Sequence, residues 1–145
     1  MDTKGITKIM MGLLLAVLLL AASLFTYFFF FGPPVEEAEC ALGINWKILS
    51  VAGKEDLCYN QQKQELRFTV ENGVTVPLAG VYVKAGDKQD DFLEQTIEKA
   101  GAFIGKISVK EEEASIKIYP VVDLEGAATA CLDEVIERNN VANCG

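Results

Sequence analysis

Residues 9–31 read IMMGLLLAVLLLAASLFTYFFFF, a run of 23 residues without one charged side chain. An α-helix rises about 1.5 Å per residue, so a run of this length can cross a hydrocarbon core of roughly 30 Å. Its weakly polar members are Ser23, Thr26 and Tyr27, and the Ser and Thr hydroxyls can bond the carbonyls of their own helix. Residues 32–34, Gly-Pro-Pro, follow and end the helix, because proline lacks an amide hydrogen. The run therefore predicts one transmembrane helix.

The charged residues that flank this run predict its orientation. Lys4 and Lys8 precede it, whereas Glu36, Glu37 and Glu39 follow it. Because positive charge is retained in the cytoplasm, the N-terminus is expected inside and the C-terminal domain outside. A cleaved secretory signal is the weaker alternative, since its apolar stretch would be only about 7 to 15 residues long. We expect a single-pass membrane protein, in contact with membrane lipid, whose larger domain lies at the cell exterior.

The leader before the run carries a second signal. Lys4 and Gly5 stand just ahead of the long apolar helix, and this arrangement resembles the class III signal peptide of archaeal type IV pilins. The resemblance implies that a prepilin-type peptidase cuts between Gly5 and Ile6 and leaves the helix on the mature protein. The mature start Ile6-Thr7-Lys8 lacks the proline that many archaeal pilins carry, and Met10 stands where bacterial pilins have a glutamate. The alternative is an uncleaved signal anchor with an ordinary basic flank.

These boundaries divide the chain into four parts. We expect a leader at residues 1–5, a transmembrane or filament-core helix at 6–31, a linker at 32–39 and a disulfide-bonded β domain at 40–145.

The net charge of the chain is −8. Asp2 is the one acid and Lys4 and Lys8 are the two bases before residue 32, so the rest holds 20 acidic and 11 basic residues. This balance argues against a nucleic-acid partner, because phosphate binding needs clustered Lys and Arg.

The part after the linker has the pattern of a β domain. Alternation between apolar and polar residues predicts strands, and the Asn72-Gly73 pair predicts a tight turn, because both residues tolerate positive φ. Asp90 and Asp91 could cap a short helix over residues 91–104, in which Leu93, Ile97, Ala100 and Ile104 make a helical stripe. The predicted strands are residues 44–51, 57–59, 66–71, 78–84, 105–110 and 115–122.

Several short strands without a βαβ unit favour an antiparallel β-sandwich, so the predicted fold class is mainly β with one N-terminal helix. The pilin resemblance implies the same architecture, an immunoglobulin-like or pilin-like head. In this domain the resemblance rests on Cys58-Tyr59-Asn60, on residues 70–73 and on Cys144.

The four cysteines all lie beyond the apolar run, which is typical of an oxidised exterior domain with two disulfides. Spacing favours the local pairs Cys40–Cys58 and Cys131–Cys144, each closing a loop worth about 3 kcal/mol in the chain-entropy model. The main alternative pairs Cys40 with Cys144 and Cys58 with Cys131. A zinc site is disfavoured, because no two cysteines have the short spacing of zinc knuckles.

The sequence offers no catalytic constellation. There is no histidine, which removes the commonest general base and the usual triads. Asp123, Glu125, Asp133 and Glu134 could form a carboxylate pair for acid–base work, but nothing in the sequence buries or pairs them, so solvated charges are the better interpretation. We therefore expect no enzyme, no cofactor and no metal site.

The function expected from these features is structural. The chain would be a subunit of a type IV pilus-like filament that polymerises with copies of itself through its helix and displays an acidic head for adhesion. The alternative is a monomeric, membrane-anchored domain that binds a partner at the cell surface. Both use the same helix, and the fate of Lys4, Gly5 and Ile6 separates them.

Overall fold

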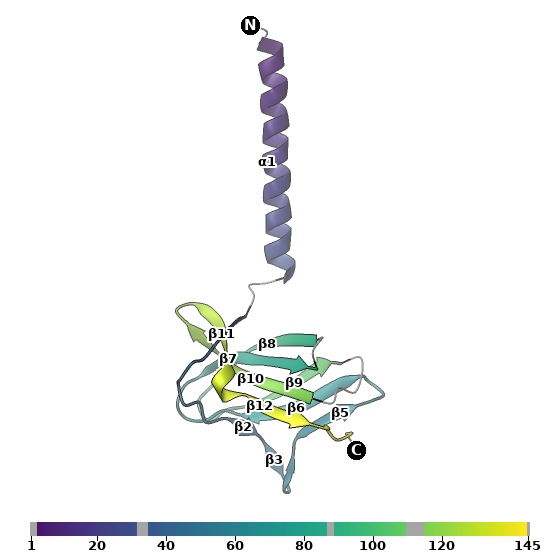
Figure 1. Ribbon diagram of the computed structural model, residues 1–145, viewed down its shortest axis with the longest axis vertical. Coiled ribbons are helices and arrows are strands. Elements are labelled where there is room, and N and C mark those ends of the chain that lie inside the picture. The colour runs from purple at the N-terminus through teal and green to yellow at the C-terminus, as the bar shows by residue number, and fades with distance from the viewer. Residues whose placement is uncertain (1–2, 32–34, 87–88, 110–114, 145) are drawn as a thin grey trace. The chain divides into compact units, whose positions relative to one another are not determined.

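A computed structural model describes residues 3–31, 35–86, 89–109 and 115–144, and side chains are described throughout except at 3–10 and 27–31. The chain divides into two compact units, residues 1–34 and 35–145 (Figure 1). The first unit contains one helix and the second, called the head below, contains all the strands.

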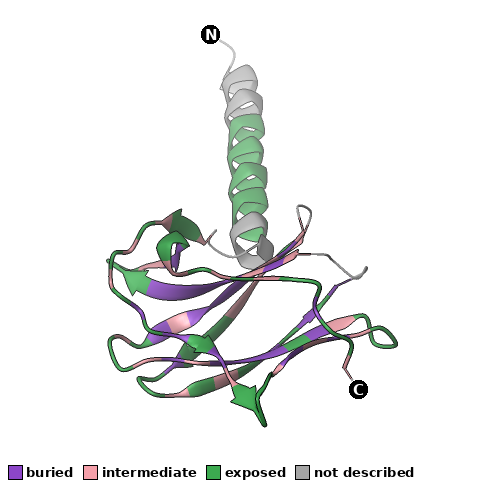
Figure 2. Cartoon of the chain, turned by 60° about the horizontal axis from the view of Figure 1, so that its bottom comes forward, coloured by how far each residue is buried: buried purple, intermediate pink, exposed green. Residues whose placement is uncertain are grey.

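The helix α1 spans Thr3–Phe31, 29 residues, and so contains the apolar run that opens the sequence. Ser23 Oγ donates to the carbonyl of Leu20, and Thr26 Oγ1 donates to that of Ala22, as expected for hydroxyls in an apolar helix. Every side chain from residue 11 to residue 26 is exposed (Figure 2). Among the residues whose side chains are described, no helix is long and apolar enough to cross a membrane.

The larger sheet of the head has six strands, in the order β1-β11-β10-β7-β8, with β12 also pairing with β10. All neighbours are antiparallel except β1 and β11, which run parallel. The strands are β1 (Glu36–Ala38), β7 (Leu78–Ala85), β8 (Gln89–Ile97), β10 (Ser115–Leu124), β11 (Ala127–Cys131) and β12 (Ile136–Asn139).

The smaller sheet has four strands, with β6 at its centre between β9 on one side and β2 and β5 on the other. A separate two-stranded hairpin projects from it. The strands of the sheet are β2 (Lys47–Ile48), β5 (Leu57–Asn60), β6 (Glu65–Glu71) and β9 (Ala102–Ser108), and those of the hairpin are β3 (Ser50–Val51) and β4 (Lys54–Glu55).

One hydrophobic core lies between the two sheets. Phe68 and Val70 of β6 are fully buried in the same cluster as Val81 of β7 and Ile118 of β10. Alternate residues of these strands point inward, as the period-2 pattern predicts. The mainly β class and the single N-terminal helix are thus confirmed. The expectation of a purely antiparallel head is wrong, because β1 adds a parallel strand from the segment assigned to the linker.

The short helix expected over residues 91–104 is absent. This segment forms β8 and the start of β9, separated by a turn in which Ala100 has a φ of 57°. Leu93 and Ile97 face the core, as expected, but a spacing of four residues is also two strand periods, so the stripe fits a strand equally well. The segment forms a strand rather than a helix because β8 pairs with β7.

The Asn72-Gly73 pair does not close a hairpin, because the strands on either side of it belong to different sheets. Asn72 instead connects the segment that crosses from the smaller to the larger sheet with the turn between β8 and β9. Its buried Nδ2 lies 2.9 Å from the Val76 carbonyl and within 3.2 Å of the carbonyls of Ile97 and Glu98, on the turn between β8 and β9.

Gly105 supports this core by being small. It lies opposite Phe68 in the β6–β9 register, and a Cβ built at Gly105 would overlap the Phe68 ring, which is fully buried.

Gly105→Ala is expected to lower the free energy of unfolding of the head by about 1–3 kcal/mol, because an overpacked ring must move. Chemical denaturation followed by the fluorescence of Trp46, the one tryptophan, measures the change. Ile104→Thr is the control, since Ile104 is 58% exposed and its replacement should be nearly neutral. Equal stability of Gly105→Ala and the parent protein would contradict this packing.

Candidate functional site

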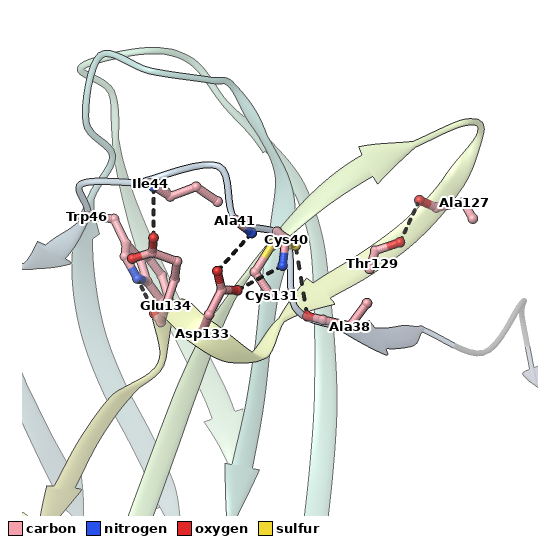
Figure 3. Close-up of a disulfide and its surroundings, with 10 residues drawn as sticks. All are labelled: Ala38, Cys40, Ala41, Ile44, Trp46, Ala127, Thr129, Cys131, Asp133 and Glu134. Atoms are coloured by element: carbon pink, nitrogen blue, oxygen red, sulfur yellow. Dashed lines mark hydrogen bonds between the residues drawn. A yellow bond between two sulfur atoms is a disulfide. The ribbon is translucent and has the colours of Figure 1, made fainter.

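The chain enters the head through a cluster of contacts that we call the linker anchor. It consists of Cys40, Ala41, Ile44 and Trp46 on the entering segment, and Cys131, Asp133 and Glu134 at the end of β11 and in the short 3₁₀ helix Leu132–Glu134 (Figure 3). These two groups of residues are about 90 positions apart in sequence. All of these residues belong to the head, and the anchor fixes the first part of the chain within it.

A disulfide joins Cys40 to Cys131, with Cα atoms 5.2 Å apart. The parallel pairing of β1 with β11 places Ala38 opposite Cys131, so Cys40 follows within reach. The second disulfide joins Cys58 to Cys144. Both pairings derived from spacing, Cys40–Cys58 with Cys131–Cys144 and its alternative, are therefore wrong. The prediction of two disulfides is confirmed, and the described residues hold no free cysteine.

Asp133 closes the anchor over the disulfide. Its Oδ1 accepts the backbone N–H of Cys40 at 2.9 Å, and its Oδ2 accepts that of Ala41 at 2.8 Å. The bond from Cys40 is the main reason why the pKa of Asp133 lies below its ordinary value; the loss of solvation opposes this effect, and the bond from Ala41 adds a smaller lowering. These bonds hold Ala41, which has a φ of 49°, in a left-handed conformation that is unfavourable for a residue with a Cβ.

Glu134 fixes the next part of the entering segment. Its Oε1 accepts the backbone N–H of Ile44 at 3.1 Å, while its own carbonyl accepts the Trp46 indole N–H at 2.7 Å. Ile44 and Trp46 are buried in the core between the sheets. Asp133, which is exposed as expected, and Glu134, which is half-buried, thus also act as structural hydrogen-bond acceptors. Sequence gave no sign of this, because their partners lie some 90 positions away.

A salt bridge attaches β1 to the outer face of the larger sheet. Lys84 Nζ on β7 lies 2.6 Å from Glu37 Oε1, and 5.5 Å and 5.8 Å from the ring centres of Tyr82 and Tyr119. The bond to Glu37 is the main cause that raises the pKa of Lys84. The Tyr82 hydroxyl donates to Asp90 Oδ2 at 2.6 Å, and burial followed by this bond raises the pKa of Tyr82. β1 is therefore held on both its edge and its face.

The second disulfide fastens the other end of the head. The Tyr59 N–H donates to the Ala142 carbonyl, and the Cys144 N–H donates to the Tyr59 carbonyl, both at 2.9 Å, so the final segment runs along β5. Cys58–Cys144 then locks it there. In sequence order the two disulfides cross, because Cys58 lies inside the span from Cys40 to Cys131 and Cys144 lies outside it. A stretching force applied to the chain at Cys40 would pass through the disulfide to Cys131, which is 91 positions further along the sequence, without extending the segment between them.

The remaining candidates from the sequence have separate places. Lys4, Gly5 and Ile6 lie in the first turns of α1, and their side chains are outside the described ones. Asp123 and Glu125 lie at the β10–β11 turn, where Asp123 Oδ1 accepts the N–H of Gly126 at 2.8 Å. Cys40, Cys131 and Asp133 offer ligand atoms within 4.8 Å of one another, but both sulfurs are engaged in the disulfide and do not bind a metal in that state. The anchor is suited to mechanical connection rather than to catalysis.

The disulfide connectivity can be tested by removing one pair at a time. Cys40→Ala/Cys131→Ala is expected to lower the free energy of unfolding by about 4–5 kcal/mol in the chain-entropy model, and Cys58→Ala/Cys144→Ala by a similar amount, because the loops have similar lengths. Only the first variant should speed cleavage by a glutamate-specific protease at residues 36–39, since only there is β1 released. A non-reduced digest in which Cys40 is linked to Cys58 or Cys144 would contradict the assignment.

The Asp133 bonds predict a pH dependence. A carboxylate whose pKa is depressed in the folded state contributes stability that is fully present above its unfolded pKa and is lost as the pH falls through the folded pKa. The difference in unfolding midpoint between the parent protein and Asp133→Asn should therefore be constant above about pH 5 and shrink below the ordinary value of 3.8. Thermal unfolding at a series of pH values measures it, with Asp123→Asn as the control. A difference that does not change with pH would refute the role of the Asp133 charge.

Comparisons with models of protein families, with curated proteins and with solved structures find no match. The resemblance to archaeal pilins therefore stays a prediction, and the case for a function rests on this chain's own residues.

Proposed function

We propose that this chain is a structural subunit of a type IV pilus-like extracellular filament. It polymerises through α1 and displays the acidic head, a pilin-like β-sandwich, for adhesion. The proposal includes a membrane stage, in which the apolar helix lies in lipid before assembly, and a prepilin-type peptidase that removes residues 1–5.

The observation that carries the proposal is the apolar surface of α1. Leu13 is 64% exposed, Leu18 is 60% exposed and Leu19 is 65% exposed, and at about 100° per residue these three lie roughly 100–140° apart around the helix axis. Each buried side chain of this kind gains about 1.5–3 kcal/mol over an exposed one, so a helix that is apolar all round requires cover. Lipid or a bundle of identical helices would provide it.

The disulfides support an exterior location for the head. Two disulfides in a small domain are typical of an oxidising compartment, and the basic residues before the apolar run favour an exterior position for that domain. In a filament the helices would form the core, so the heads must remain attached to them under load. The linker anchor suits this task, because the Cys40–Cys131 bond carries tension from the end of the helix segment into the larger sheet.

The mature N-terminus tests the proposal directly. Mass spectrometry of the protein from native membranes or filaments is expected to find Ile6 as the first residue, because the peptidase would cut after Gly5. Gly5→Leu should leave the leader in place and abolish filaments seen by negative-stain electron microscopy. Thr3→Ala is the matched control, since Thr3 lies in the same leader but outside Lys4, Gly5 and Ile6, and the cut would remove it before assembly.

Two outcomes would overturn the proposal. A parent protein that retains Met1 to Gly5 and forms no filaments would favour the alternative, a monomeric membrane-anchored binding domain. Filaments that assemble equally well from Gly5→Leu would show that the leader has no role in processing.

A further inference from the structure

A groove lined by charged and amide side chains lies on the head, and none of its lining residues belongs to the linker anchor. Its volume is about 860 Å³, and it is bounded by the β3–β4 hairpin, by β5 and β6 and by the last described residues, 138–144. Both arginines of the chain, Arg67 and Arg138, line it. The Cys58–Cys144 disulfide lies in its wall and joins the last described residue to β5.

The two arginines have different roles. Arg138 is occupied by protein, because its Nε and Nη2 donate to the two oxygens of Glu55, at 2.8 Å and 2.5 Å. Arg67 is not occupied in this way. It forms a longer ion pair with Asp56, whose Oδ2 lies 3.8 Å from Nη2 and so beyond hydrogen-bond distance. That oxygen already accepts the Thr69 hydroxyl at 2.5 Å, and the Arg67 side chain is 49% exposed.

Three asparagines extend the supply of polar groups along the groove. Asn139, Asn140 and Asn143 line it and are exposed, and within the described part of the chain their side-chain amides make no hydrogen bond. Each amide offers a donor and an acceptor side by side. Such pairs match the vicinal hydroxyls of a sugar, whereas the fork of an arginine matches a carboxylate.

The charge of the groove is opposite to that of the head. Lys54, Arg67 and Arg138 line it together with Glu55 and Asp56, so its lining carries one net positive charge in an acidic protein. Lys106 lies directly opposite Arg67 in the β6–β9 register and extends the positive row. Repulsion from the distant acids is screened beyond about 8 Å at physiological salt, so the local charge decides what the groove attracts.

An extended peptide fits this groove less well than a glycan. Peptides commonly bind beside a strand by adding to a free sheet edge. Here the edge of β5 at Tyr59 is already taken by Ala142 and Cys144 of the final segment.

We propose that this groove binds an acidic polysaccharide of the uronic acid class, with Arg67 holding a sugar carboxylate and the asparagine amides holding hydroxyls. The inference deepens the adhesion part of the proposed function and depends on it for its biological meaning. It names the class of surface to which the head would attach.

The full chain in a non-ionic detergent can be titrated calorimetrically with a galacturonic acid trisaccharide, with the neutral galactose trisaccharide as the comparison. Only the acidic sugar is expected to bind, and more weakly as salt rises. Arg67→Gln should weaken binding by about tenfold, because it removes a charge-assisted hydrogen bond. Asn143→Ala should weaken it less. Lys99→Gln, which removes an equal charge from an exposed turn outside the groove, should leave the affinity unchanged.

Absence of binding, or equal affinity of Arg67→Gln with an unchanged unfolding temperature, would overturn the inference. Equal affinity for a polyglutamate peptide would also overturn it, by showing a general anion surface. Filament assembly does not depend on these contacts. Filaments without sugar binding would therefore refute the groove alone, whereas sugar binding without filaments would refute the filament alone.

Discussion

The bond between Cys40 and Cys131 fixes the position at which the chain enters the head, and the rest of the entry segment is arranged around it. The bond holds the end of β1, a short strand that pairs in parallel with β11, against its neighbour. The carboxylate of Asp133 then satisfies the two backbone N–H groups beside the bond. A three-residue strand alone would have little stability, since isolated pairs of short strands are marginal in water.

The second disulfide complements the first at the opposite end of the sequence. It holds the final segment along β5 and so covers an edge that would otherwise be free to pair with another chain. The two bonds cross in sequence, and together they enclose almost the whole head between Cys40 and Cys144. The core between the two sheets, in which Phe68 packs against Gly105, and a smaller buried cluster around Tyr82 and Tyr119 add further stability.

The proposed filament assigns separate tasks to the two units. The helix would supply a continuous apolar core, and the head would supply chemistry to the surroundings. The groove around Arg67 is the part of the described head where exposed asparagine side chains, a net positive lining and a disulfide-bonded wall coincide. Because the disulfide that forms this wall also fixes the final segment, one bond would serve both stability and recognition.

Local pattern was sufficient for much of this molecule. The charge-free run predicted α1, and period-2 alternation predicted β5, β6, β7 and β10, because burial on one face of a strand imposes that period on the sequence. The even number of cysteines after the run predicted two disulfides. No pattern of this kind could distinguish helix from strand at Leu93 and Ile97, since a spacing of four residues satisfies both periods.

Tertiary structure alone decided which residues became partners. The cysteine pairs, the bonds from Asp133 and Glu134 and the crossing at Asn72 all join segments far apart in sequence. Spacing favours short loops, because closing a short loop costs less entropy, and it therefore pointed to the wrong disulfides. The parallel insertion of β1 beside β11 outweighed that preference, because strand pairing brings Cys40 and Cys131 together before any loop length is considered.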